Sequence, residues 1–273
     1  MVRGQCLSKH KEKPRPAPHL VAKIITAAAF SLLLMPLLAV VIYSFIAPVP
    51  SASGLVWQPS LIWYERLFQD QLIATTLFMS LQVAAITSAI ATLLGVAGAI
   101  ALERGKFPGR HLLSSLTMVP LVMPELVMGL ASVIWFACLG LGLGMHTIII
   151  GHVTFALSYV VITVRARLAD FDISLEEAAA DLGATPAKVF GTVTLPLIAP
   201  AIAAGGMMAF TLSFDDFLIS FFTAGAGSDT LPMRLYSMIR FGLNREIYAL
   251  SSLLILATIT GMAISYRLRG LRH

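Results

Sequence analysis

Apolar residues form six long runs along the chain, and shorter polar segments separate them. The runs cover residues 24–47, 75–102, 112–139, 146–164, 200–222 and 247–268. Each is close to or above the length of about 20 residues that an α-helix needs to cross the hydrocarbon core of a bilayer. The pattern therefore predicts an all-α integral membrane protein with six transmembrane helices.

Polar and proline residues interrupt three of these runs. Pro36 predicts a kink in the first helix, and Pro120 and Pro124 predict a break in the third, because proline cannot donate a backbone hydrogen bond. The fifth run contains two adjacent acids, Asp215 and Asp216. Charged residues at bilayer depth are costly, so such interruptions indicate functional positions.

The first run raises the alternative of a cleaved signal peptide, since basic residues precede it. This apolar stretch of 24 residues exceeds the roughly 7–15 of a signal-peptide core, which favours a retained helix. The expected organisation is a basic tail (1–23), a first helix (24–47), an external segment (48–74), a five-helix core (75–268) and a short tail (269–273).

Composition supports the membrane assignment and narrows the chemistry. Hydrophobic residues make up 58% of the chain and charged residues 12%, whereas soluble domains carry about 25% charged residues. The two cysteines, Cys6 and Cys138, have no His or Cys partner at metal-ligand spacing, so no metal site is expected. A net charge of +5 is interpreted as a topology signal rather than as a nucleic-acid surface.

Lysine and arginine residues concentrate on one predicted side of the membrane. That side holds 15 of the 19, including the Pro-rich basic stretch 9–18, which is expected to contact the lipid surface. The other side holds only Arg66, Arg234, Arg240 and Arg245. The positive-inside rule therefore predicts that both termini are cytoplasmic, in agreement with an even number of helices.

Motifs of the common enzyme classes are missing from the sequence. There is no P-loop, no H-E-x-x-H zinc motif and no G-x-S-x-G nucleophile elbow. Asp215 and Asp216 are adjacent, and adjacent residues of a helix do not face each other, which argues against an intramembrane aspartyl protease. His146 and His152 near one helix end are expected to be structural. The chain is predicted to be neither an enzyme nor a cofactor-binding protein.

The cytoplasmic segment 165–199 has the pattern of two short helices. Ser174 and Glu177 fit a capping box at the start of the first, and Gly183 fits a left-handed cap at its end. Thr185 followed by Pro186 predicts the start of the second.

Leu195 and Pro196 are expected to end that second helix and to return the chain to the membrane. Ala178, Ala179 and Ala180 leave the first helix with a face that is almost bare of side chains. Such a face permits the close approach of another chain.

This segment resembles the EAA loop of inner-membrane permease subunits of ABC importers. The matching residues are Glu177-Ala178-Ala179, then Gly183, Val193 and Leu195-Pro196 at the family's spacing, with Val193 in place of the usual isoleucine. In that family the loop docks into a groove of a separate ATPase subunit. The resemblance thus implies ATPase docking for Glu177, Ala178, Ala179, Gly183, Leu195 and Pro196.

Further segments resemble the second permease of spermidine/putrescine importers. They are Met123-Pro124-Glu125, Ser213-Phe214-Asp215-Asp216-Phe217, Leu231-Pro232-Met233, Ser237-Met238-Ile239-Arg240-Phe241-Gly242 and Glu246-Ile247-Tyr248-Ala249-Leu250. Permeases for opines, iron, thiamine or other organic cations share parts of this pattern, so these substrates remain alternatives to a polyamine.

The resemblance implies a type I importer permease (MetI-like) fold in the bacterial inner membrane. It also implies four kinds of partner: a homologous second permease, two ATP-binding cassette ATPase subunits, a periplasmic solute-binding protein and membrane lipid. The external segments 48–73 and 223–246 are the surfaces available to the binding protein. A stand-alone secondary transporter is the competing class, but it would not explain the docking loop.

Three acids are candidates for a cation path: Glu125, Asp215 and Asp216. Counted along straight helices from Leu112 and Pro200, Glu125 and Asp215 reach a similar depth of roughly 20 Å. A multiply charged amine needs such acceptors to replace its hydration shell. The alternative is that the acids cap broken helices or pair with Arg234 or Arg240.

Overall fold

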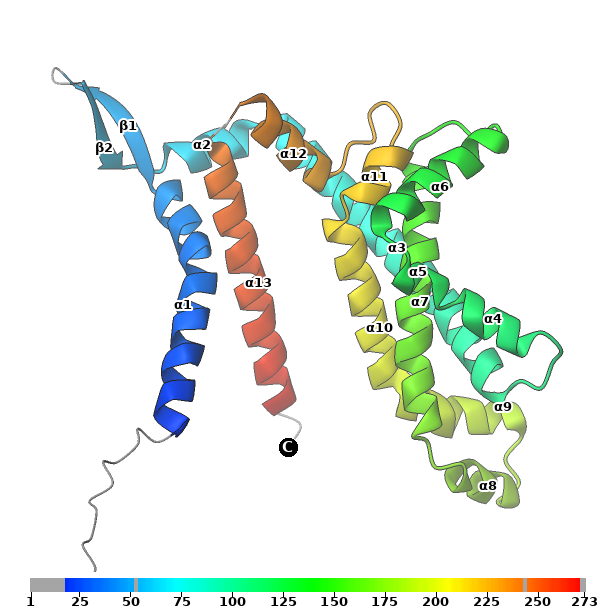
Figure 1. Cartoon of the computed structure of the whole chain (residues 1–273). Coiled ribbons are helices and arrows are strands. Elements are labelled where there is room, and N and C mark those ends of the chain that lie inside the picture. Colours follow the sequence, from blue (N-terminus) through cyan, green and yellow to red (C-terminus); the bar gives the residue numbers. More distant parts are fainter. Residues whose placement is uncertain (1–17, 52–53, 243–244, 271–273) are drawn as a thin grey trace, which may run out of the picture. The chain divides into compact units, whose positions relative to one another are not determined.

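The computed structural model describes residues 18–51, 54–242 and 245–270, which are mostly helical (Figure 1). Contacts group the chain into two compact units, Asp70–Asn244 and Met1–Gln69 with Arg245–His273. Most of the predicted tails 1–23 and 269–273 lies outside the described residues. The last helix, expected within the core 75–268, belongs to the same unit as the first helix.

The unit Asp70–Asn244 holds most of the helices. They are α3 (Gln71–Arg104), α4 (Arg110–Leu116), α5 (Val119–Val122), α6 (Glu125–Cys138), α7 (Met145–Ala169), α8 (Ser174–Asp181), α9 (Pro186–Val189), the π-helix η1 (Phe190–Thr194), α10 (Leu195–Asp215), α11 (Leu218–Thr223) and α12 (Leu231–Phe241).

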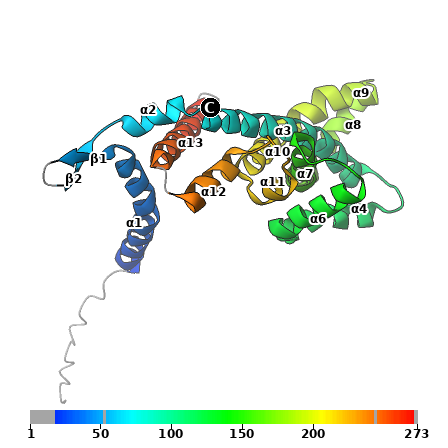
Figure 2. The ribbon, with the colours of Figure 1, turned by 90° about the horizontal axis from the view of Figure 1, so that it is seen from above.

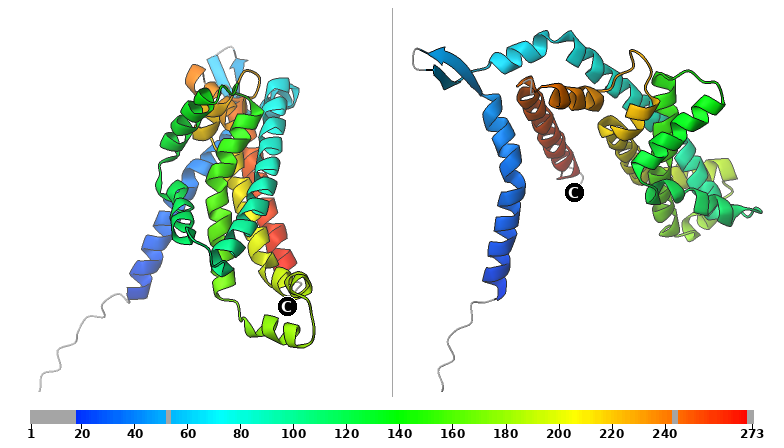
Figure 3. Two further views of the ribbon diagram at one scale, coloured as in Figure 1. Left: turned by 90° about the vertical axis from the view of Figure 1, so that its right-hand side faces the viewer. Right: turned by 45° about the horizontal axis from the view of Figure 1, so that its top comes forward.

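Helices α3, α7 and α10 lie side by side and form the core of this unit (Figures 1 and 3). Val160 of α7 is fully buried between two glycines, Gly95 of α3 and Gly205 of α10. A Cβ atom on Gly95 would lie 2.6 Å from Val160 Cγ1, so there is no room for a larger residue at this position. Small residues at such contacts are typical of helix packing in membranes.

Two of the predicted spans are broken. The pair Arg110–Val122 and Glu125–Cys138 is bent by 114° at Met123-Pro124, which confirms the predicted break in the third run. The fifth run stops at Asp215 and resumes as α11 at Leu218. The depth of Glu125 estimated from a straight rise is therefore wrong, because the chain changes direction just before this residue.

The other unit contains α1 (Pro18–Ser44), the antiparallel strands β1 (Ile46–Ser51) and β2 (Gly54–Pro59), α2 (Ile62–Gln69) and α13 (Glu246–Gly270). Figure 2 shows the β-hairpin between the end of α1 and the start of α2. The predicted external segment 48–74 therefore has regular structure of its own. The first helix ends at Ser44 rather than at residue 47, because β1 begins at Ile46.

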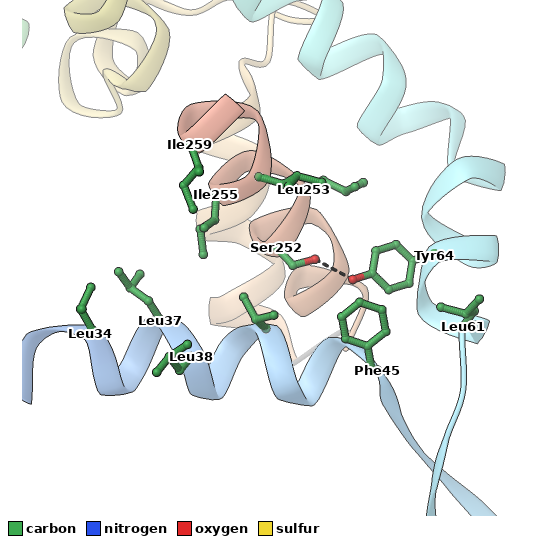
Figure 4. A pocket seen from close by; sticks show the side chains of 12 residues that line it. Leu34, Leu37, Leu38, Phe45, Leu61, Tyr64, Ser252, Leu253, Ile255 and Ile259 are labelled. Carbon is green, nitrogen blue, oxygen red and sulfur yellow. Dashed lines mark hydrogen bonds between the residues drawn. The ribbon is translucent and has the colours of Figure 1, made fainter. Parts of the chain in front are cut away.

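Tyr64 connects the helices of this unit. Its hydroxyl is 2.8 Å from Ser44 Oγ at the end of α1 and 2.8 Å from Ser252 Oγ of α13. Beside it, α1 and α13 enclose an apolar pocket of about 560 Å³ (Figure 4). The outer side chains of α1, such as Leu33 and Met35, are largely exposed, as expected for a helix covered by lipid or by another chain.

Within the described residues, five helices are long and apolar enough to cross a bilayer, and the bent pair α4/α5–α6 would make a sixth. The predicted count of six is therefore met when the broken third run is taken as one span. The all-α fold class is confirmed, with one short β-hairpin added.

The contact between Gly95 and Val160 gives a test of the core. We expect Gly95→Ala to destabilise the protein by about 1–3 kcal/mol, because the added methyl group has no room against Val160. Gly98→Ala is the matched control, since its Cβ would make an ordinary contact of 3.5 Å with Val161. Thermal unfolding in detergent, followed by size-exclusion chromatography, measures both. Equal midpoints for the two variants would contradict this packing.

Candidate functional site

The segment between α7 and α10 forms the first candidate site, and α8 opens it. The amide of Ser174 donates to Asp172 Oδ1 at 3.0 Å. Hydrogen bonds from the hydroxyl and the amide of Ser174 hold the pKa of Asp172 below its usual value. The predicted capping box of Ser174 and Glu177 is wrong, because α8 already begins at Ser174 and Asp172 supplies the acceptor.

Gly183 ends α8 as predicted. Its φ is +83°, in the left-handed region that favours glycine. The amide of Gly183 donates to Ala180 O, and the amide of Ala184 donates to Ala179 O. These two bonds are those of a Schellman motif, which satisfies the last carbonyls of the helix.

The second short helix begins as predicted, with Thr185 at the N-cap and Pro186 at its first position. Its predicted end at Leu195 and Pro196 is wrong. The chain passes from α9 through η1 directly into α10, and Pro196 lies in the first turn of that long helix. Proline is tolerated in the first turn of a helix, and the wide π-turn before it relieves the crowding of the backbone.

Glu176 attaches α8 to the rest of the unit. Its Oε1 accepts from Arg104 Nη1 at 2.8 Å and from the hydroxyl of Thr194. Arg104 ends α3 and Thr194 ends η1, so one carboxylate joins three elements. No local sequence pattern indicates this contact, because the partners of Glu176 are 72 and 18 residues away along the chain.

The residues of this contact also line an open groove of about 380 Å³. Its lining includes Glu177 and Ala180 of α8 together with Pro186 and Phe190 of the following turn. On the outside, Ala178 and Gly183 are exposed, and Leu182 keeps 89% of its surface accessible. An exposed leucine beside small residues is the composition expected of a surface that receives another chain.

The three candidate acids form the second site, near the breaks of the two spans. Glu125 begins α6 directly after the bend, and Asp215 is the last residue of α10. Both side chains are exposed. Gly129, one turn after Glu125, packs against Leu218 and Ile219, which follow Asp215 and Asp216 closely along the chain, so the three acids lie in one region of the unit. The structure thus brings together acids from two separate runs.

Among the residues that the structure describes, no lysine or arginine forms a salt bridge with Glu125 or Asp215. Arg234 lies 3.8 Å from Asp70 Oδ2 instead, and Arg240 stacks on the rings of Tyr236 and Phe241. Asp215 also lies at the C-terminal end of its helix, where a negative charge is unfavourable. These two carboxylates remain available to an external cation.

Asp216 has different surroundings. Its side chain is 3% exposed, and its Oδ1 accepts the amide of Ser220 at 2.9 Å in the first turn of α11. His152 Nε2 lies 3.2 Å from the same oxygen. Asp216 therefore caps a broken helix, which is the alternative left open for these acids, and it does not share the exposure of Asp215.

His152, Asp216, Ser213 and Ser220 together contain the residue types of a hydrolase triad. All four are buried, and the space between them is too small for a water molecule. A nucleophilic serine would have no route to a substrate there. The expectation that His152 is structural agrees with this environment, although the sequence did not indicate its link to Asp216.

Comparisons with known proteins relate this chain to membrane components of transport systems. Residues 91–271 match the family described as "Binding-protein-dependent transport system inner membrane component". The chain is 41% identical over 240 residues to the putrescine transport system permease protein PotI of Escherichia coli (strain K12), covering 85% of this chain and 84% of that protein.

The chain is also 35% identical over 233 residues to the spermidine/putrescine transport system permease protein PotC of Escherichia coli (strain K12), covering 85% of this chain and 87% of that protein. Among solved structures, a bacterial ABC transporter involved in the import of alginate contains a chain that aligns with a TM-score of 0.72 at 15% identity. That alignment covers 94% of this chain and 99% of the other.

The fold and the matched family define a multi-pass permease of an ABC importer in the inner membrane. The chain belongs to the family of binding-protein-dependent transport system inner membrane components. As a member of that family, it works together with other components of an import system.

Proposed function

We propose that this chain is the permease subunit that carries a polyamine, putrescine or spermidine, across the inner membrane. The observation that carries the proposal is the convergence of the exposed acids Glu125 and Asp215 with no basic partner among the described residues. The names of two relatives, PotI and PotC, support the same substrate class.

The physical reason is the cost of moving charge through a membrane. A carboxylate at bilayer depth costs about 2.5–3.5 kcal/mol on insertion scales, so it is retained where it meets water or an opposite charge. A polyamine has the complementary need, because its ammonium groups lose their hydration shell in the path. Glu125 and Asp215, on separate helices, offer acceptors for two ammonium groups of one molecule.

Transport in this proposal is driven by ATP hydrolysis in partner subunits. One of the two ATPase subunits docks on the α8–α9 segment through Glu177, Ala178, Ala179 and Gly183, with Leu195 and Pro196 leading into α10. A second homologous permease shares the path, and a periplasmic binding protein delivers the solute. Both termini are cytoplasmic, as the distribution of basic residues indicates.

Two alternatives remain distinct from this proposal. Another organic cation, an opine or iron would use the same importer class, and the assembled complex would then prefer that solute over putrescine. A stand-alone secondary transporter would need no docking segment. The exposed small-residue surface of α8, held in place by Glu176, favours the importer.

The docking segment gives a prediction with a matched control. Gly183→Val places a β-branched residue at a left-handed position, at a cost of about 1–2 kcal/mol, and distorts the end of α8. Gly109→Val meets the same strain at φ +87° in another loop. We expect both variants to insert normally, but only Gly183→Val, like Ala178→Trp, to lose the ATPase during co-purification. Normal recovery of ATPase and normal uptake with both docking variants would contradict the assigned role.

The acids give the second prediction. Glu125→Gln and Asp215→Asn keep the side-chain shape and remove one charge each, so we expect each to raise the KM for putrescine uptake by about tenfold or more, as loss of a charged hydrogen bond does. Assembly and basal ATPase activity should stay intact. Asp229→Asn, an exposed acid in the loop after α11, is the control and should have little effect. Unchanged uptake in both variants, or a loss explained by failed assembly, would show that these acids are structural.

A further inference from the structure

His152 is a buried polar residue that contacts both sides of the break between α10 and α11. Its side chain is 1% exposed. Nδ1 lies 2.7 Å from Ser213 Oγ, which belongs to α10. Nε2 lies 3.2 Å from Asp216 Oδ1 and 3.0 Å from Ser220 Oγ, beyond the end of α10. One imidazole therefore joins α7 to both halves of a broken span.

The partners determine the direction of these hydrogen bonds. An ionised carboxylate can only accept, so Nε2 carries the proton that is donated to Asp216. In the neutral ring Nδ1 is then an acceptor and receives the hydroxyl of Ser213. Ser220 Oγ is a further neighbour of the Nε2 proton. The network thus satisfies the buried Asp216 carboxylate within the protein.

The remaining contacts of α11 attach it to α7 and α6. Thr147 Oγ1 of α7 donates to Thr223 O at 2.8 Å. A Cβ atom on Gly151 of α7 would lie 2.8 Å from Ile219 Cγ2, and one on Gly129 of α6 would lie 2.8 Å from Phe222 Cδ2. Helix α11 therefore has little freedom against α7, and the adjustable part is the short connection at Asp216 and Phe217.

We propose that His152 is a positioning residue for the cation path. By holding Asp216 and the first turn of α11 through Nε2, it fixes the chain direction at the end of α10 and with it the placement of the neighbouring Asp215 carboxylate. This inference rests on the proposed function, in which Asp215 meets the substrate. His152 itself is buried and touches no solute.

The network also separates the roles of two adjacent acids. Asp216 has a hydrogen-bond donor in His152 and a backbone amide in Ser220, whereas Asp215 is exposed. Because adjacent side chains point in different directions, a rotation of the chain at the break would move Asp216 out of its buried place and Asp215 away from its exposed one. A satisfied polar network of this kind resists such a rotation, since it would leave buried groups without partners.

Two amide substitutions of His152 test the roles of its two ring nitrogens separately. In His152→Gln the side-chain amide reaches the place of Nε2, and in His152→Asn it reaches only the place of Nδ1. We therefore expect His152→Gln to keep the hydrogen bond to Asp216 and His152→Asn to lose it. Hydrogen–deuterium exchange of the assembled complex, measured on a peptide spanning residues 213–224, tests this directly.

We expect exchange at the amides of α11 to be about tenfold faster in His152→Asn and near that of the unmodified chain in His152→Gln. We also expect His152→Asn to raise the KM for putrescine by about tenfold with kcat nearly unchanged, and His152→Gln to restore it. Equal exchange in the two variants, or exchange that differs without any difference in KM, overturns the proposal.

The two proposals can fail separately. Unchanged KM in Glu125→Gln and Asp215→Asn, together with different exchange in the two His152 variants, refutes the cation path and retains the hold of His152 on the break. If either His152 variant does not assemble, Asp216→Ala and Ser213→Ala replace them, because the first removes the acceptor of both Nε2 and the Ser220 amide and the second removes only the partner of Nδ1. Faster exchange in Asp216→Ala than in Ser213→Ala is then the expected result, and equal or reversed rates overturn the proposal.

Discussion

A carboxylate inside a membrane needs an opposite charge, a hydrogen-bond donor or water, and this constraint organises the region around the two helix breaks of the unit Asp70–Asn244. Three acids lie in that region, where α6 packs against α11, and their surroundings are of two kinds. Asp216 is buried against His152 and the amide of Ser220. Glu125 and Asp215 stay exposed, at the points where two spans are broken. The breaks in the two spans therefore lie at the positions of the exposed acids.

The same unit links the acids to the segment that resembles a docking loop. Helix α10 begins directly after η1 and ends at Asp215, a continuous element of 21 residues. At about 1.5 Å per residue this is roughly 30 Å. Glu176 holds α8 to Thr194 at the start of this element, and His152 holds the chain just past its end. Close packing of α3, α7 and α10 around Val160 keeps the element in a fixed place between the two.

Features governed by local rules could be predicted from the sequence. The apolar runs predicted the spans, Gly183 predicted a left-handed turn, and Pro124 predicted a break, because each depends on a residue and its immediate neighbours. Glu125, Asp215 and Asp216 stood out as candidates because a charge in an apolar run has few explanations, and their role as a cation path stays a prediction.

Features that depend on distant contacts could not be predicted. The contacts of Glu176 with Arg104 and of His152 with Asp216 join residues 72 and 64 positions apart, and neither has a local pattern. The capping box failed for a different, local reason, since Asp172, two residues before Ser174, accepts the amide that the pattern assigned to Glu177. The continuation of the helix through Leu195 and Pro196 could not be predicted, because no sequence pattern indicates the π-turn before it. Asp215 and Asp216 also look equivalent in the sequence, although Asp215 is exposed and Asp216 is buried.

The most direct test is uptake of labelled putrescine into proteoliposomes that contain this chain with its second permease, the ATPase subunits and the binding protein. Uptake that requires ATP and the binding protein, and that unlabelled spermidine but not an uncharged solute suppresses, is the result expected of a polyamine importer. Uptake that persists when the ATPase subunits are omitted would contradict the central claim and would instead identify a stand-alone transporter.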